Sequence, residues 1–386
     1  MFFYLYTIVS LLIYLIALPF LLLFSFKTKY KESIPARFFL WKNPPLSPHG
    51  IWFHTCSFGE AKAIKPLVDA LPQEQLRMTT TTQTGKEMID TYTEQSRYLP
   101  FETLLLGWMR PQKALVVMEA EFWYLLFALA KRKGAKTLLI NARISEKSFP
   151  KYYRMVWLYR EIFKYIDEVY AQTQADKERL ESLGAHHVTV TGNIKLAALP
   201  KVTRRLVKPQ GLVVCAGSTH HKEEEVILQA FAALKQREKD AKLIIVPRHP
   251  ERFKKVMEDV NTFAQEHTMH WHAFSQDMSL NTDITVVDRL GELVNVYAVS
   301  DLVILGGAFE PIGGHNAAEA AQFGCKIISG PHYFNQKDIF SAIEGITIVQ
   351  PEKLSQVLVS YEKIPSAKLT NSVDVSPILQ SLSSAP

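Results

Sequence analysis

The sequence has 386 residues, of which 47% are hydrophobic and 21% are charged, and its formal net charge is +6. This length suits two ordinary α/β domains, and no tract is polar enough to predict long disorder. Because the sequence has neither a Cys/His finger nor a dense Lys/Arg run, we do not expect nucleic acid as a partner. Cys56, Cys215 and Cys325 lie far apart without a CxxC pair, which argues against a disulfide framework or a zinc site and favours a reducing compartment.

The first predicted element is an apolar segment, residues 1–26, that contains no charged side chain. At about 1.5 Å per residue it can cross a hydrocarbon core of about 30 Å. A cleaved signal peptide is the alternative, but a basic start and a small-residue cleavage site are not evident. Basic residues follow the segment: Lys27, Lys29, Lys31, Arg37 and Lys42. We expect them to face anionic lipid headgroups and, by the positive-inside rule, to keep the rest of the chain cytoplasmic.

Beyond this segment, short β-rich runs alternate with helical patterns, which is typical of βαβ units. The predicted strands of the first half are residues 50–55, 78–82, 114–119, 137–141 and 169–173. Those of the second half are residues 212–216, 243–247, 284–288, 302–306 and 326–329. A linker near residues 197–209 separates the halves, because prolines and charges follow a strand-like run there. We therefore predict two doubly wound, Rossmann-like domains, residues 27–199 and 200–386, and the final helical segment could pack back on the first.

The loops that follow the strands carry the functional prediction, because open parallel sheets bind ligands beyond the carboxyl ends of their strands. Neither GxGxxG with a downstream acid nor GxxxxGK[ST] is present, which argues against a dinucleotide dehydrogenase and a P-loop NTPase. After the first strand, Glu60 stands at the start of a helix expected over residues 61–71. The helix dipole would keep this carboxylate ionised and able to accept a proton, although an ordinary first-turn acid has the same position.

Two more loops of the first half have suitable chemistry. The Thr-rich loop around Thr82 and Thr84 offers hydroxyls and amides to an anionic or sugar group, although threonine runs are also simply common in strands. Beyond the third strand, Glu119 and Glu121 stand close together, and a buried carboxylate there would need a partner. We expect one of them to face a ligand; the alternative is a helix N-terminus that favours acids.

In the second half, a Ser-Thr pair ends the first strand and Arg248 follows the second, so hydroxyls and a guanidinium suited to phosphate would meet at one sheet edge. The most specific motif has two glycine pairs, around Gly307 and Gly314, followed by a helix. Its glycines would let the backbone approach a phosphate, and Glu319 on the helix could bridge two ribose hydroxyls. A flexible turn with a capped helix is the alternative.

The ordered series of motifs resembles the bacterial Kdo (3-deoxy-D-manno-octulosonic acid) transferases of lipopolysaccharide assembly over nearly the whole chain. The motifs that carry the resemblance are Ser57-Phe58-Gly59-Glu60, Thr84-Gly85, Glu119-Ala120-Glu121-Phe122-Trp123, Asn141-Ala142-Arg143, Gly192-Asn193-Ile194-Lys195, Ser218-Thr219-His220, Pro247-Arg248-His249, Gly291-Glu292-Leu293 and Gly313-Gly314-His315-Asn316. The resemblance implies a GT-B fold, CMP-Kdo as the donor and a lipid A precursor as the acceptor, with no metal and no cofactor.

The resemblance also implies residue roles. The catalytic base corresponds to Glu60 and a second important carboxylate to Glu119. Acceptor-binding residues would be Ser57, Gly59, Thr82 and Thr84. The donor pocket would use Arg248, Gly307, Gly314, Asn316 and Glu319, with Ser218, Thr219 and Lys195 nearby. The sequence departs from the family pattern at Gln83, Tyr124 and Leu196-Ala197, which leaves the acceptor contacts and the Lys195 loop open.

We therefore expect an inverting glycosyltransferase anchored to the inner membrane by one N-terminal span, with its catalytic domains in the cytoplasm. Glu60 would deprotonate an acceptor hydroxyl, and Arg248 would stabilise the departing phosphate without a metal. Three alternatives stay open: a GT-B transferase that uses a UDP-sugar on another lipid, a nucleotide-sugar epimerase, and a degenerate membrane-tethered binding protein. The apolar segment argues against the epimerase, because a soluble substrate needs no anchor.

Overall fold

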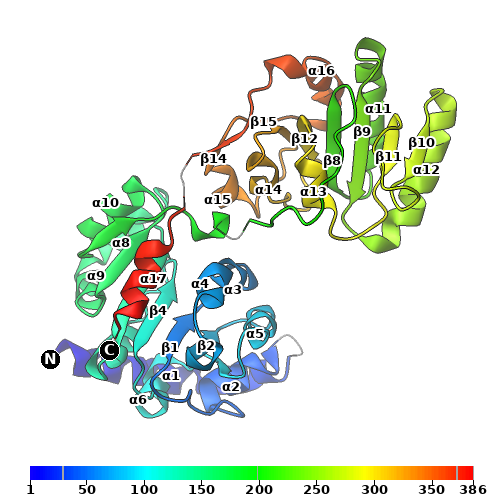
Figure 1. The fold of residues 1–386 in the computed structure, drawn as a ribbon. Coiled ribbons are helices and arrows are strands. Elements are labelled where there is room, and N and C mark those ends of the chain that lie inside the picture. Colours follow the sequence, from blue (N-terminus) through cyan, green and yellow to red (C-terminus); the bar gives the residue numbers. More distant parts are fainter. Residues whose placement is uncertain (28–29, 198, 371–372, 386) are drawn as a thin grey trace. The chain divides into compact units, whose positions relative to one another are not determined.

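The computed structural model describes residues 1–27, 30–197, 199–370 and 373–385. The chain divides into two compact units: unit 1 contains Met1–Ala198 and Ser372–Pro386, and unit 2 contains Leu199–Asn371. Each unit is built on one seven-stranded sheet with helices packed against it (Figure 1). The predicted fold class, two doubly wound Rossmann-like sheets preceded by an apolar helix, is confirmed.

The sheet of unit 1 is parallel and has the order β3-β2-β1-β4-β5-β6-β7. Its strands are β1 (Ile51–His54), β2 (Leu76–Thr80), β3 (Ser96–Tyr98), β4 (Ala114–Met118), β5 (Lys136–Ala142), β6 (Glu168–Ala171) and β7 (Val188–Val190). Successive residues of β4 alternate between two cores, with Leu115 and Val117 in one and Val116 and Met118 in the other. A strand buried on both faces is a continuous apolar run, which explains why the sequence identified it.

Helices cover both faces of this sheet. They are α2 (Ser33–Phe39), α3 (Phe58–Ala63), α4 (Lys65–Asp69), α5 (Gln83–Asp90), α6 (Leu105–Trp108), α7 (Tyr124–Arg132), α8 (Phe149–Arg154), α9 (Val156–Phe163), α10 (Gln174–Ser182) and α17 (Ser376–Ser383). The single helix predicted over residues 61–71 is wrong, because the chain forms α3 and α4 with a break at Ile64. Pro66 accounts for the break, since its nitrogen has no hydrogen to continue the helical bonding.

The apolar N-terminal helix α1 (Phe2–Ser25) is the one helix among the described residues that is long and apolar enough to cross a membrane. One side of it packs on unit 1. The Tyr6 hydroxyl donates to Glu102 Oε2 at 2.6 Å, and the Tyr14 ring stacks on Phe101 with centroids 5.6 Å apart. These contacts lie two turns apart, so the first half of α1 runs along the surface of unit 1 and leaves its other side exposed.

The basic residues after α1 differ in their surroundings. Lys31 and Lys42 line a hollow of about 690 Å³ in unit 1. Arg37 turns inward instead, and its Nε donates to the Leu99 carbonyl at 3.1 Å. The expectation that Arg37 faces lipid headgroups is therefore wrong, because its guanidinium is held by the protein. Lys29 lies outside the described residues.

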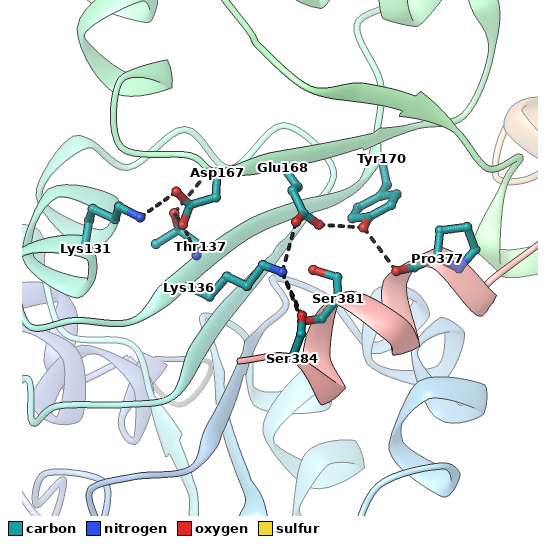
Figure 2. A network of polar contacts seen from close by, with 9 residues as sticks. All are labelled: Lys131, Lys136, Thr137, Asp167, Glu168, Tyr170, Pro377, Ser381 and Ser384. Carbon is teal, nitrogen blue, oxygen red and sulfur yellow. Dashed lines mark hydrogen bonds and ion pairs between the residues drawn. The ribbon is translucent and has the colours of Figure 1, made fainter. Parts of the chain in front are cut away.

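The C-terminal helix α17 belongs to unit 1, although it follows unit 2 in the sequence (Figure 1). Ile378 and Leu382 are buried in the same core as β1. Figure 2 shows the polar part of this contact, in which the Lys136 ammonium donates to the Ser381 carbonyl at 3.1 Å and pairs with Glu168 at 2.9 Å. Both apolar and polar contacts thus hold α17 against the sheet.

Unit 2 repeats the doubly wound plan with the strand order β10-β11-β9-β8-β12-β13-β15. Its strands are β8 (Val213–Thr219), β9 (Lys242–Pro247), β10 (Trp271–Ala273), β11 (Ile284–Val286), β12 (Leu302–Leu305), β13 (Lys326–Ser329) and β15 (Ile346–Ile348), and β14 (Ile343–Glu344) pairs separately with β16 (Lys368–Leu369). Its helices are α11 (Glu223–Arg237), α12 (Phe253–Glu266), α13 (Leu293–Tyr297), α14 (Ala318–Ala321), α15 (Lys337–Phe340) and α16 (Leu354–Val359).

Candidate functional site

Both sheets reverse their strand order at one point. In unit 1 this switch point lies between β1 and β4, and in unit 2 it lies between β8 and β12. Loops at such a point diverge and leave room for a ligand beyond the strand ends. In unit 1, Glu60 lies at the start of α3 after β1, and Glu119 follows β4; in unit 2, Ser218 lies near the end of β8, and Gly307 follows β12. Each unit therefore places predicted site residues where its topology favours binding.

Glu60 lies in the first turn of α3, as predicted, in a tight capping arrangement. Ser57 is the N-cap residue, and its Oγ accepts from the Glu60 amide at 3.3 Å. In return, the Glu60 carboxylate accepts from the Cys56 amide at 2.8 Å and from the Ser57 hydroxyl at 2.9 Å. This reciprocal pattern resembles a capping box, which fixes the position of the carboxylate without consuming its remaining lone pairs.

The proton affinity of Glu60 differs from the prediction. Burial raises the pKa of its carboxyl, the charges of Glu119 and Glu121 raise it further, and the hydrogen bonds from Cys56 and Ser57 lower it. The net shift is upward, whereas the sequence predicted that the helix start would favour the ionised form. Because a general base works best when its pKa approaches the operating pH, the environment makes Glu60 a stronger base than an exposed glutamate.

Glu119 is held by a polar network at the end of β4. The Lys195 ammonium lies 2.8 Å from its Oε1, and the Asn141 amide donates to the same oxygen at 3.5 Å. Asn141 also accepts from the Ile194 amide at 2.9 Å, which ties the Lys195 loop to β5. Glu119 has the left-handed φ of +57°, a costly conformation for a residue with a side chain. Lys195, predicted to lie near the donor residues, thus contacts the second carboxylate of unit 1.

The predicted acceptor residues surround the Glu60 loop. The Thr82 hydroxyl donates to the Cys56 carbonyl at 2.9 Å and caps α5 by accepting from Gly85. Gly59 and Thr84 are exposed on the first turns of α3 and α5, which contact each other. The structure thus brings all four predicted acceptor residues, Ser57 included, to one edge of unit 1.

In unit 2, glycines let two loops approach each other closely at the switch point. A Cβ at Gly306 would lie 2.2 Å from the Ser218 carbonyl oxygen and 2.7 Å from Thr219 Cα. Gly307 and Gly314 have φ of +72° and +83°, a region that suits glycine. The glycine motif is therefore required by local geometry, and it places Ser218, Thr219 and the glycine loop side by side.

The amides of this motif behave differently from the prediction. Gly313 and Gly314 both donate to the Gly307 carbonyl, at 3.0 and 2.7 Å, so these amides are occupied within the loop. The following helix, α14, has only four residues and offers a weak dipole. Within the described residues, the amides of His315 and Asn316 have no internal acceptor. Any phosphate at this loop would therefore meet these two amides rather than those of the glycines.

Glu223, which the sequence reading did not identify, holds the two loops together. Its side chain is 1% exposed and accepts from three amides: His220 at 2.9 Å, Gly307 at 2.8 Å and Phe309 at 3.0 Å. A buried carboxylate needs such partners to offset its lost hydration. Its only sequence signal was a run of three acids at the start of α11, which is also typical of any helix N-terminus.

The remaining donor candidates lie around these loops. The Arg248 side chain is exposed, and no acceptor for it is found among the described residues. Glu319 accepts from Asn316 at 3.4 Å and lies 3.6 Å from His315 Nε2. The Thr219 hydroxyl is buried without a hydrogen-bond partner in the described part of the chain. The Arg248 guanidinium and the partly exposed Glu319 carboxylate are thus accessible to a ligand in unit 2, whereas the Thr219 hydroxyl is fully buried.

Comparison with known proteins identifies the chain's relatives. Residues 32–198 match the family model of 3-deoxy-D-manno-octulosonic-acid transferase (kdotransferase). The 3-deoxy-D-manno-octulosonic acid transferase of Rickettsia bellii is 30% identical over 350 residues, 85% of this chain and 82% of that protein. That of Haemophilus influenzae is 31% identical over 362 residues, 87% and 83% of the two chains.

Among solved structures, the UDP-GlcNAc 2-epimerase of Neisseria meningitidis bound to UDP-GlcNAc has a TM-score of 0.50 at 14% identity, covering 81% of this chain and 90% of the epimerase. At that identity the likeness concerns the fold alone. The C-terminal CMP-Kdo binding domain of WaaA from Acinetobacter baumannii is 27% identical, with a TM-score of 0.34, covering 45% and 88% of the two chains. From its sequence relatives, the chain belongs to the Kdo transferase family of glycosyltransferases.

Proposed function

We propose that this protein transfers Kdo from CMP-Kdo to a lipid A precursor, with inversion and without a metal ion, and that Glu60 is the base. The observation that supports the proposal most strongly is the fixed position of Glu60 together with the raised pKa of its carboxyl. Glu60 is fixed by Ser57 and Cys56 at a switch point, and burial together with Glu119 raises the pKa of its carboxyl. These are the properties of a group that removes a proton from a hydroxyl.

The donor would bind to unit 2. Breaking the bond between the anomeric carbon and the phosphate leaves negative charge on CMP, and the exposed Arg248 guanidinium with the free amides of His315 and Asn316 would stabilise that charge. Glu319, whose side chain is partly exposed, would contact the nucleoside. Ser218 and Gly307 would form the wall beside the phosphate.

The acceptor would reach unit 1 from the inner membrane surface, with both units in the cytoplasm. The exposed apolar side of α1 provides an anchor, and the hollow lined by Lys31, Lys42 and the exposed Trp41 adjoins α5, which carries Thr84. Lysine ammonium groups near a membrane attract phosphates of anionic lipids. The hollow is also lined by Lys86 and Arg97 and by the acids Glu32, Glu87 and Asp90. A phosphorylated glycolipid that stays in the bilayer would therefore meet lysines within a mixed-charge surface that adjoins α5.

Glu60→Gln tests the proposal. The variant keeps the size of the side chain and its contact with the Cys56 amide, but it cannot accept a proton at neutral pH. We expect transfer from CMP-Kdo to a tetraacylated lipid A precursor in EDTA to fall by about 10² to 10⁴, while CMP binding persists. Mass spectrometry of the lipid would also count the Kdo residues added. Glu146→Gln, at an exposed glutamate of the same unit, is the matched control.

The outcomes separate the parts of the proposal. Near-normal transfer by Glu60→Gln would remove Glu60 from the mechanism. Loss of wild-type transfer in EDTA would contradict metal independence. Displacement of bound CMP-Kdo by UDP as readily as by CMP would favour a UDP-sugar donor.

A further inference from the structure

Three side chains with different ligand atoms meet beside the Glu60 loop. His54 is the last residue of β1, Cys56 lies in the loop that follows β1, and Glu121 lies in the loop after β4. We refer to these three residues as the His-Cys-Glu cluster. Their ligand atoms all lie within 4.8 Å of one another. His54 Nε2 lies 3.7 Å from Cys56 Sγ. Tetrahedral zinc, with Zn–S of about 2.3 Å and Zn–N of about 2.0 Å, sets these two atoms about 3.5 Å apart.

The outer contacts of the cluster orient its ligand atoms. His54 Nδ1 lies 2.9 Å from the Thr79 hydroxyl and 3.3 Å from the Thr79 carbonyl oxygen. Because a carbonyl oxygen can only accept, this contact favours a proton on Nδ1 and directs the lone pair of Nε2 at Cys56. The Trp123 indole donates to Glu121 Oε2 at 2.7 Å, which leaves Oε1 for a ligand. Metal-binding histidines and carboxylates have such second contacts.

Charge and access also favour a cation. His54 is fully buried, whereas Cys56 and Glu121 are partly exposed, so an ion can enter from the solvent side and keep a water ligand. The carboxylate of Glu60 interacts electrostatically with the carboxylates of Glu119 and Glu121. Arg37 opposes them, since its guanidinium is close to the cluster. With Lys195 engaged by Glu119, the surroundings remain net negative once the thiol is deprotonated.

We propose that the His-Cys-Glu cluster binds a borderline divalent cation such as Zn²⁺ and that the bound ion inhibits transfer. On binding, the thiol releases its proton to solvent and its sulfur bonds the ion as a thiolate. The ion is then attached to the loop whose Cys56 amide donates to Glu60, so it is bound directly beside the proposed base. The inhibition rests on the proposed role of Glu60, whereas the binding does not.

Binding is tested on the metal-free, full-length protein in detergent. Calorimetric titration with Zn²⁺ should give one ion per chain, and Co²⁺ in its place should give a thiolate-to-cobalt charge-transfer band. Cys56→Ser should weaken Zn²⁺ binding by at least about 100-fold, because loss of even a second contact to a ligand can lower metal affinity by that factor. The variant should also lack the charge-transfer band. Cys325→Ser, a buried cysteine of unit 2, is the matched control and should change neither.

Glu121→Gln keeps the test decisive if Cys56→Ser fails to fold, because it removes a partly exposed ligand and should also weaken Zn²⁺. Equal affinity in the wild type and either variant, or a cobalt spectrum without the band, would overturn the site. The ratio of transfer rates with and without Zn²⁺ tests inhibition, which should disappear in Cys56→Ser. Binding without inhibition of the wild type would refute the regulatory half. Absence of transfer in EDTA would instead contradict the metal independence of the proposed function and leave the binding result intact.

Discussion

The loops of unit 2 should loosen when Glu223 loses its charge. In Glu223→Gln, the amide oxygen can replace Oε2, which accepts from His220 and Gly307, but the NH₂ group then faces the Phe309 amide. One buried N–H is left unsatisfied, at a cost of about 1–3 kcal/mol. That cost corresponds to a factor of about 5–150 in a local opening equilibrium.

Hydrogen exchange read by mass spectrometry measures this opening directly. Peptides that contain residues 306–310 should exchange faster by the same factor in Glu223→Gln, and CMP should bind more weakly because the loop proposed to contact it is less ordered. Glu225→Gln, an exposed acid in the same helical turn, is the control. If both variants exchange alike across residues 306–310, Glu223 does not position the glycine loop and the hydrogen-bond argument is refuted.

Three other predictions follow from the structure. The acid limb of the kcat/KM profile should lie above the pKa of an ordinary glutamate, because burial and, after it, the charges of Glu119 and Glu121 raise the pKa of Glu60. Glu121→Gln should move that limb to lower pH. An unchanged limb would contradict the electrostatic coupling between Glu121 and Glu60. Ile378→Ala should lower the free energy of unfolding of unit 1 by about 2–5 kcal/mol, because Ile378 is only 1% exposed and lies in the core. Urea unfolding followed by the fluorescence of the unit 1 tryptophans measures this change. A smaller decrease than that caused by a substitution at an exposed site would show that α17 contributes little. The cysteine of a Phe2→Cys variant should not react with a membrane-impermeant thiol reagent added to intact spheroplasts, because the contact of Tyr6 with Glu102 holds the start of α1 on unit 1. Rapid labelling would show that α1 leaves this surface to span the membrane.

The sequence predicted the central strands but missed short edge strands. All ten predicted strands correspond to strands of the two sheets, whereas β3, β7, β10 and β15, three residues each, are not among the ten; only β7 had a sequence signal, the strand-like run before the linker. All four are at sheet edges. A three-residue strand is too short to show alternation or a sustained apolar run, so it forms only because a neighbouring strand offers hydrogen bonds. The edge strands depend on tertiary contacts that local sequence does not encode.

The site was predictable where one loop contains it. Ser57 and Glu60 form a local capping pattern, so their position followed from the sequence. The direction of the Glu60 pKa shift did not follow from the sequence, because burial, its largest cause, and the charges of Glu119 and Glu121 from another loop arise only in the folded unit. The Lys195 contact with Glu119 is equally non-local. Spacing also gave no sign of the His-Cys-Glu cluster, since its ligands come from two strands that become neighbours only in the folded sheet.

The return of α17 to unit 1 sets an order for the biosynthesis of this protein. The ribosome makes α1 and the seven strands of the first sheet early, but the core beside β1 lacks Ile378 and Leu382 until α17 emerges, after the whole of unit 2. Unit 2 can complete its own fold in the meantime, because it is continuous in sequence and domains generally fold as units. A ribosome that stopped after unit 2 would therefore leave a nascent protein whose unit 1 exposes the apolar surface that α17 otherwise covers.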